Sequence, residues 1–352
     1  MDESTIRCAD RPLGDGAPCL TIAEIGSNHD GSLARALALV DLAAEAGADA
    51  VKLQSFHAAT LVARRRRVSE GAWRPVEAYP VLEKLEVPAE WHAPLRDRAR
   101  ERGVLFLSTP FDEERATLLA GLGVPAMKVA SGDLTHLPLL RRIGSFGRPV
   151  ILSTGLSAPD EIDAALAALA EGAGCEQRRP PVVLLHCVSL YPLKPGDANL
   201  RVLPAMRARH GTLVGWSDHS PGHALALGAV ALGACVVEKH FTDDRRRSGP
   251  DHGFAMEPAE WRAMVDAIRM LEAGLGDGVK RPRPDEEPER FWARRALHAA
   301  RALPAGTTLD ARDVKIVRPA DGLPPAALAT VVGRRLARAL EVDQPLVAED
   351  LA

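Results

Sequence analysis

The sequence predicts a parallel eight-stranded β/α barrel, the TIM-barrel architecture, followed by a small β-rich domain. Strand-like and helix-like segments alternate from about residue 20 to residue 274. The strand-like segments are apolar runs rich in Val, Ile and Leu, as expected of strands that are buried on both faces. Eight β/α units in about 255 residues match the usual size of a TIM barrel.

Each predicted strand ends in polar residues. The carboxyl ends of the strands in a parallel barrel form one rim, and the active sites of this architecture lie there. In chain order, the polar residues at the ends of the eight runs are Glu24 and Asn28, Lys52 and Gln54, Ser108 and Thr109, Lys128 with Ser131 and Asp133, Ser153 and Thr154, Ser189 and Tyr191, Ser217 and His219, and Glu238 and His240.

Six segments between these strands have apolar residues at helical spacing. Two of them end at Gly47 and Gly103, and glycine is common directly after a helix. A third begins with Pro159 and two acidic residues, which suit a first helical turn. The predicted helices cover residues 31–47, 87–103, 136–147, 158–172, 221–233 and 257–274.

The chain is expected to contain two domains. The barrel domain covers residues 1–278, of which residues 1–19 are an amino-terminal extension. Residues 279–290 belong to a stretch rich in Pro, Gly and charge and are predicted to be a linker. The small domain, 291–352, alternates turn signals with three strand-like pieces at residues 296–304, 314–319 and 337–342.

Composition argues against several functions. The net charge of −3 gives no electrostatic reason to expect binding to nucleic acid or membranes. The run Arg64–Arg67 is interpreted as a solvated loop, with attraction of an anionic substrate as the alternative. The amino terminus lacks a signal-peptide pattern, and no apolar run reaches the roughly 18 residues of a membrane span. The five scattered cysteines predict reduced thiols in a cytoplasmic protein.

Two histidines at adjacent strand ends suggest a metal site. Imidazoles at His219 and His240 can share a divalent ion and leave its other positions open to water or substrate. Glu238 shares a strand face with His240 and can orient or extend this site. His252 is a weaker candidate. The alternative is that these histidines are ordinary polar residues on the rim.

Two lysines interrupt apolar strands. A buried lysine is costly unless it meets an anion, so Lys52 and Lys128 together predict binding of a phosphate or carboxylate. Hydroxyl groups from several serines would add donors on the same rim. The alternatives are that each lysine extends to solvent, or that one forms a Schiff base in an aldolase. The second lysine and the histidine pair argue against the aldolase.

Glu24 ends the first strand. Its carboxylate is suited to position a hydroxyl or to take part in proton transfer, and a buried ion pair with Lys52 is the alternative. Gln54, Tyr191, Asp133 and Asp251 have side chains that can bind sugar hydroxyls.

These residues occur in segments that resemble the sialic acid synthase family, also called N-acetylneuraminate synthases, which includes legionaminic and pseudaminic acid synthases. The resemblance covers nearly the whole chain, and residues 294–322 resemble the antifreeze-like (SAF, β-clip) domain fused to these enzymes. In family order, the matching segments are AEIGSNHDGS, VKLQSF, LSTPFD, MKVASGDL, PVILSTGL, LLHCVSLYP, GWSDHS, EKHFTDD and GPDHGFAM.

The resemblance implies a transferase that condenses phosphoenolpyruvate with the open-chain aldehyde of an N-acetylmannosamine-type sugar and releases phosphate by C–O cleavage. It implies that Mn²⁺ or Mg²⁺, bound by His219 and His240, polarises the aldehyde. The implied phosphoenolpyruvate-binding residues are Lys52, Lys128, Ser131, Ser153, Ser189 and Ser217. The implied sugar-binding residues are Glu24, Gln54, Asp133, Tyr191, Asp251, Trp292 and Arg318.

The last two residues belong to the small domain, which in the family reaches the active site of a partner subunit. The resemblance therefore implies a domain-swapped homodimer. Some family members carry asparagine in place of Ser189 and glutamate in place of Asp133, and residues 61–78 match no sugar-binding pattern. These departures leave the acceptor sugar open.

Two other functions compete with this interpretation. A different phosphoenolpyruvate-dependent sugar-acid synthase would share the barrel and the lysines but would not need the antifreeze-like domain. A non-catalytic sugar-binding barrel would not need a pair of metal-binding histidines.

Overall fold

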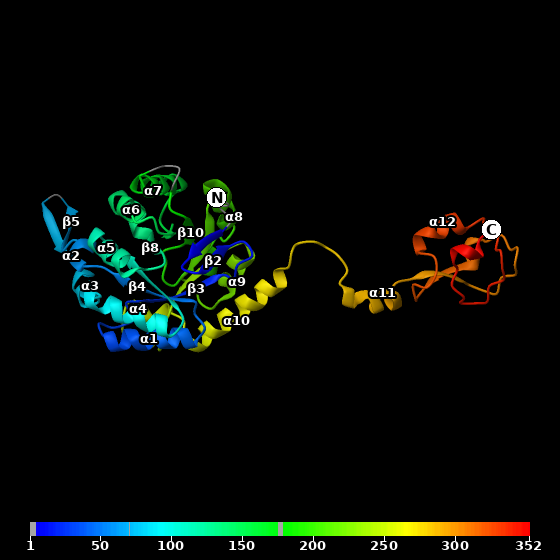
Figure 1. Ribbon diagram of the computed structural model, residues 1–352, viewed down its shortest axis with the longest axis horizontal. Coiled ribbons are helices and arrows are strands. Elements are labelled where there is room, and N and C mark those ends of the chain that lie inside the picture. Colours follow the sequence, from blue (N-terminus) through cyan, green and yellow to red (C-terminus); the bar gives the residue numbers. More distant parts are fainter. Residues whose placement is uncertain (1–4, 70, 175–178) are drawn as a thin grey trace. The chain divides into compact units, whose positions relative to one another are not determined.

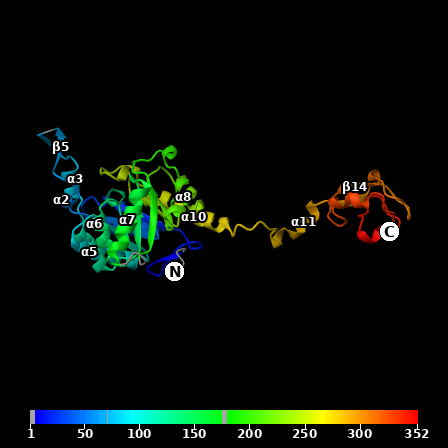
Figure 2. The same ribbon diagram turned by 90° about the horizontal axis from the view of Figure 1, so that it is seen from above.

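The computed structural model describes residues 5–69, 71–174 and 179–352, and Cys175 lies outside these ranges. The chain divides into two compact units, Met1–Gly276 and Asp277–Ala352 (Figures 1 and 2). Within the described part of the chain, no helix is both long and apolar enough to cross a membrane.

The first unit is built around eight parallel strands in the order β7-β4-β3-β12-β11-β10-β9-β8. The two ends of this order, β7 and β8, lie against each other, so the sheet forms a nearly closed barrel with helices around it (Figure 1). The predicted TIM barrel is confirmed. Its strands are β3 (Leu20–Gly26), β4 (Ala50–Ser55), β7 (Leu105–Pro110), β8 (Met127–Val129), β9 (Val150–Ser153), β10 (Val182–Cys187), β11 (Leu213–Asp218) and β12 (Val236–His240).

The sequence pattern revealed six of the main helices around this barrel and missed two. Helix α5 begins after Asp112, whose side chain accepts a hydrogen bond from the Arg115 N–H at 2.7 Å, and α8 buries only Leu203 and Met206. In both helices the apolar and polar residues are spread around the helix, so neither shows a clear apolar face. The helices are α1 (Leu33–Glu45), α4 (His92–Glu101), α5 (Glu113–Leu122), α6 (Leu137–Gly144), α7 (Pro159–Gly172), α8 (Val202–His210), α9 (Ala224–Ala231) and α10 (Pro258–Leu275).

Apolar side chains fill the amino-terminal half of the barrel interior, and we call this cluster the apolar plug. The amino-terminal extension contributes to it, because β1 (Thr5–Cys8) and β2 (Arg11–Gly14) form a hairpin whose Ile6, Cys8 and Leu13 pack into the same cluster. The sequence had not predicted this hairpin. The other members of the plug lie on the barrel strands or directly before them, and they are Leu20, Ile22, Ala50, Leu107, Ala126, Ile151, Val183, Leu185, Leu213, Cys235 and Val236.

The arginine run lies in a second hairpin. Strands β5 (Arg65–Ser69) and β6 (Ala72–Pro75) pair antiparallel and extend away from the barrel body, between the short helices α2 (Ala58–Leu61) and α3 (Tyr79–Lys84) (Figures 1 and 2). All of β5 is exposed, so the predicted solvation is correct but the predicted loop is wrong.

The second unit has its own small apolar core around Leu297, Leu303 and Leu340. Strands β13 (Ala296–Ala299) and β14 (Val314–Val317) pair antiparallel, as two of the strand-like pieces predicted. The third piece forms only an isolated bridge between Leu303 and Leu340. Helix α12 (Leu328–Val331) follows. The segment interpreted as a linker contains part of α11 (Glu287–Ala293).

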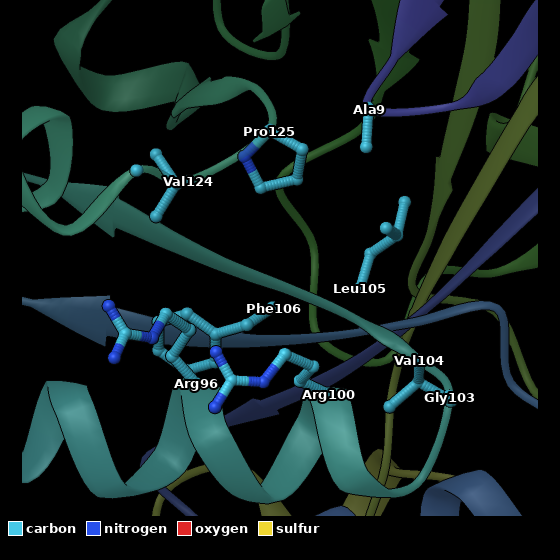
Figure 3. Close-up of a pocket in the computed structure, with 10 residues that line it drawn as sticks. Ala9, Arg96, Arg100, Gly103, Val104, Leu105, Phe106, Val124 and Pro125 are labelled. Carbon is cyan, nitrogen blue, oxygen red and sulfur yellow. The ribbon is translucent and has the colours of Figure 1, made fainter.

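A cavity of about 310 Å³ lies at the amino-terminal ends of β7 and β8 (Figure 3). It is therefore at the opposite end of the barrel from the polar strand ends. The lining residues are Ala9, Arg96, Arg100, Gly103, Val104, Leu105, Phe106, Gly123, Val124 and Pro125.

Candidate active site

Polar side chains lie inside the barrel directly beyond the apolar plug. Inward and outward positions alternate along a strand, so the residue two places beyond an inward residue also points inward. At the position directly beyond the plug, which on β11 follows the inward Gly215, every strand carries a buried polar residue or a thiol. We call this set the polar layer. Its members are Glu24, Lys52, Thr109, Lys128, Ser153, Cys187, Ser217 and Glu238.

Glu238 lies between the two lysines. Its carboxylate is 3.7 Å from Lys52 Nζ and 3.7 Å from Lys128 Nζ, and it accepts a hydrogen bond from Ser217 Oγ at 3.0 Å. Burial alone would raise the pKa of Glu238, but the two ammonium groups outweigh burial and hold the pKa well below its usual range. The carboxylate is therefore ionised and binds both lysines.

Lys52 also pairs with Glu24. Lys52 Nζ is 2.6 Å from Glu24 Oε2 and donates to Thr109 Oγ1 at 3.3 Å, while Gln54 Nε2 donates to the other Glu24 oxygen at 2.8 Å. Burial opposes the charge on Lys52, but Glu238 and Glu24 outweigh this effect and raise its pKa. The ion pair that the sequence left as an alternative is thus present.

Lys128 has weaker charged partners. It donates to Ser153 Oγ at 2.6 Å and to the Val129 carbonyl at 2.9 Å. Burial lowers the pKa of Lys128, and Glu238 only partly opposes this effect. An ammonium has three donors, so Lys128 retains capacity to bind an anion.

Two of the predicted serines meet at Gly155, in the loop after β9. A Cβ atom at Gly155 would lie 2.6 Å from Ser189 Oγ, 2.8 Å from Ser131 Oγ and 3.2 Å from Cys187 Sγ. Ser131 Oγ also accepts a hydrogen bond from the Gly155 N–H at 3.0 Å. Only glycine allows the two hydroxyl groups and the thiol to approach the backbone this closely.

The two predicted metal ligands lie close together. The rings of His219 and His240 have centroids 5.7 Å apart, and the Tyr191 ring lies 4.1 Å from that of His219. His219 Nδ1 is 2.9 Å from the Val188 carbonyl, so Nδ1 carries the proton and Nε2 keeps a lone pair. Burial and the neighbouring His240 lower the pKa of His219 to about 4, which keeps the ring neutral.

His240 Nδ1 is buried and has no hydrogen-bond partner among the described residues, and Asp251 Oδ2 lies 3.8 Å from it. That oxygen accepts a hydrogen bond from Ser27 Oγ at 2.8 Å. A Cβ at Gly26 would lie 2.8 Å from Asp251 Oδ2, 3.2 Å from Glu24 and 3.3 Å from Gln54. Three of the predicted sugar-binding side chains therefore converge on one glycine beside the histidine pair.

Comparison with known proteins decides the family. The NeuB family matches residues 39–280, and the SAF domain matches residues 294–352. The chain belongs to the NeuB family. An N,N'-diacetyllegionaminic acid synthase from Legionella pneumophila is 37% identical over 345 residues, which are 97% of each chain. An uncharacterised protein of Methanocaldococcus jannaschii is 37% identical over 346 residues, which are 98% of each chain.

A solved structure is also similar to this NeuB-family chain. The N-acetylneuraminic acid synthetase of Leptospira borgpetersenii, in complex with citrate, superimposes with a TM-score of 0.72 at 33% sequence identity. The match covers 82% of this chain and 95% of the other.

Four predicted site residues of this NeuB-family chain are not members of the polar layer. Asp133 follows β8, and burial raises its pKa to about 6, with His136 and Lys128 opposing. Tyr191 is half-exposed at the rim. Trp292 and Arg318 belong to the second unit, where both are exposed, and Trp292 packs edge-on against Phe291.

His252 has a structural role. Its Nδ1 is 2.7 Å from Thr242 Oγ1 and its Nε2 is 3.0 Å from Asp30 Oδ1, so neither nitrogen is free for a metal. Across the described residues, no three His, Cys, Asp or Glu side chains form a ready metal cluster. Any ion at His219 and His240 would therefore complete its coordination with water or substrate.

Two residues of the candidate site, Cys187 and Phe254, were not predicted from the sequence. Cys187 occupies an inward position that the alternation of β10 implies, but a thiol gave no functional signal. Phe254 lies 4.9 Å from the ring of His240 and 5.1 Å from that of Tyr191, and it follows β12 by 14 residues, so no strand pattern indicates it.

Proposed function

We propose that this protein condenses phosphoenolpyruvate with the open-chain aldehyde of an N-acetylated amino sugar to form a nonulosonic acid. A C–C bond forms between C3 of phosphoenolpyruvate and the aldehyde carbon, water adds at C2, and the C2–O bond to phosphate breaks. The observation that carries the proposal is the polar layer. Two buried lysines around Glu238, beneath a histidine pair, suit a small anion that reacts next to a carbonyl group.

The lysine side of the layer is proposed to bind phosphoenolpyruvate. Lys128 retains a free donor, and Ser153 lies beside it. The hydroxyl groups of Ser131 and Ser189 approach each other at Gly155, where they would add donors for a phosphate or carboxylate. Glu238 would hold both ammonium groups in place while their remaining donors bind the anion.

The donor set at the rim fits a divalent metal. His240 Nδ1 is a buried nitrogen that no described residue hydrogen-bonds, and the Val188 carbonyl fixes the tautomer of His219 that leaves Nε2 available. His219 and His240 would hold Mn²⁺ or Mg²⁺, which when bound supplies a Lewis acid for the aldehyde oxygen.

The side chains around Gly26 are proposed to bind the sugar. Glu24 is fixed by Lys52 and Gln54, so its carboxylate is held in one orientation to accept a sugar hydroxyl or to hold a proton. Asp251 is oriented in the same way by Ser27. Tyr191 and Asp133 would extend this contact at the rim.

Phosphate release tests the function directly. We expect release from phosphoenolpyruvate only when metal and an acceptor are both present, and none in excess chelator. His219→Ala is expected to lower the rate at least about a hundredfold, because the lost interaction supplies several kcal/mol. Full activity in chelator would disprove the metal assignment, and no release with any sugar would favour a non-catalytic barrel.

The acceptor follows from the same assay with a panel of sugars. The 37% identity to a diacetyllegionaminic acid synthase supports a 6-deoxy-diacetamido sugar. N-acetylmannosamine and its 6-phosphate are the alternative acceptor sugars to be compared in the same assay. Turnover of an unrelated aldose alone would favour another sugar-acid synthase.

We further propose that the small domain acts in a domain-swapped homodimer in the cytoplasm. Arg318 is exposed and makes no ion pair within the described part of the chain, so its guanidinium is available to a ligand. Arg318→Ala and His219→Ala proteins should each be inactive. Mixed together, they should recover about a quarter of wild-type activity, because half the dimers are mixed and one of their two sites is intact. No recovery after verified subunit exchange would mean that Arg318 does not act in trans.

A further inference from the structure

Strands β11 and β12 share a buried ion pair on their outward faces. Asp218 and Lys239 are register partners, and Asp218 Oδ2 lies 3.0 Å from Lys239 Nζ. The exposed fractions of these residues are 1% and 2%. Burial lowers the pKa of Lys239, and Asp218 opposes this effect. The pair lies on the helix side of the barrel wall, because inward and outward positions alternate and Glu238 points inward.

The same pair holds the chain on both sides of His219. Asp218 Oδ1 accepts hydrogen bonds from the Ser220 N–H at 2.8 Å and from Ser220 Oγ at 2.7 Å. The Lys239 ammonium donates to the Ser220 carbonyl. Asp218 and Ser220 are the sequence neighbours of His219, and Lys239 directly precedes His240. One ammonium therefore connects the backbone segments that carry both imidazoles.

Packing alone does not account for these charges. Two buried charges lose their hydration, and apolar residues of similar size are often as stable or more stable in such a position. Lys239 faces away from the polar layer, so it does not touch a ligand there. The contacts that remain are those to the segments around His219 and His240.

We propose that Lys239, together with Asp218 and Ser220, is a positioning network that fixes the spacing and orientation of the His219 and His240 rings. The inference rests on the proposed function, since it concerns the metal that these rings would hold. Residues behind metal ligands commonly change metal affinity about 10- to 100-fold when they are replaced.

The test is a titration of Mn²⁺ followed by electron paramagnetic resonance of the free ion, which needs no turnover. The variant is Lys239→Met with Asp218→Asn, which removes both charges together and keeps an oxygen acceptor for Ser220. We expect its dissociation constant for Mn²⁺ to rise at least about tenfold, with the fold preserved. Ser220→Ala keeps the ion pair and removes only the hydroxyl contact to Asp218, so it should give a smaller rise and provides a second reading if the double variant does not fold.

The matched control is Arg269→Met. Arg269 lies on α10, and its Nη2 is 2.7 Å from Asp49 Oδ2. Asp49 directly precedes β4, so this ion pair involves neither strand that carries a histidine. The Arg269→Met variant should be less stable than the wild type yet bind Mn²⁺ with the same dissociation constant. Unchanged Mn²⁺ binding in the folded variants would overturn the positioning role alone. A wild type that binds no Mn²⁺ would overturn the metal assignment and this inference with it. Equal loss in the control would show a general effect of stability and would also overturn the inference.

Discussion

The two ends of the barrel interior are built from the same strands but differ in chemistry. Leu20 and Ile22 of β3 pack in the apolar plug, whereas Glu24, two residues further, is ion-paired in the polar layer. On β4, Ala50 and Lys52 show the same change. Each strand therefore contributes its first inward residues to stability and its last to the site.

This difference shows how a buried charge layer is maintained. The lysines and carboxylates are costly to bury, and they are stabilised here by one another rather than by water. Burial of the apolar plug stabilises the folded state, and the plug excludes water from the amino-terminal side of the polar layer. Substitutions at the two ends should consequently affect different measurements.

The largest effect is expected in the plug. Leu20→Ala should lower the free energy of unfolding by about 2–5 kcal/mol, because it removes a fully buried side chain and leaves a cavity. Denaturant unfolding measures this loss.

The folded Leu20→Ala protein should bind phosphoenolpyruvate with an unchanged binding constant. Leu156→Ala is the control, since Leu156 is 80% exposed and should alter stability by less than about 0.5 kcal/mol. A large loss of phosphoenolpyruvate binding in Leu20→Ala would show that the two ends are not independent.

The next effect concerns the polar layer. Lys128→Ala should weaken phosphoenolpyruvate binding by about 2–4 kcal/mol, because it removes the charged partner of a buried anion. Calorimetric titration measures the change, and the Michaelis constant for the sugar should move much less. Exposed Lys84→Ala provides the control. An unaltered phosphoenolpyruvate constant would contradict the proposed anion site.

The smallest effect concerns Asp133, whose pKa of about 6 follows from its burial. If its carboxylate binds the sugar, kcat/KM for the sugar should fall about tenfold between about pH 6.5 and pH 5, and Asp133→Asn should lose this dependence. The folded-state pKa is above the usual value of 3.8, so the protonated form stabilises the fold, and this contribution is lost as the pH rises through about 6. An identical pH profile in the variant would exclude Asp133 from sugar binding.

The sequence was sufficient to predict the barrel because hydrophobic periodicity is local, and the polar strand ends share one rim in any parallel barrel. It could not predict that Glu238 binds both lysines. Lys52 and Lys128 are on β4 and β8, and their distances to β12 depend on how the strands are staggered around the barrel. The hairpins β1–β2 and β5–β6 were missed because four- and five-residue strands carry little pattern. The piece at 337–342 has strand-like composition, but only Leu340 forms a bridge.

The hairpin β1–β2 and the plug beneath the polar layer have a kinetic consequence. Because apolar side chains fill the amino-terminal half of the barrel interior, reactants and products are expected to share the opening at the rim. Lys128 is only 2% exposed, whereas Tyr191 is 51% exposed, so the proposed phosphoenolpyruvate site is deeper than the proposed sugar site. Under the proposed function, a sugar bound first would block the path to Lys128. The enzyme should then follow a compulsory order in which phosphoenolpyruvate binds first and phosphate leaves last, with phosphate a competitive inhibitor of phosphoenolpyruvate.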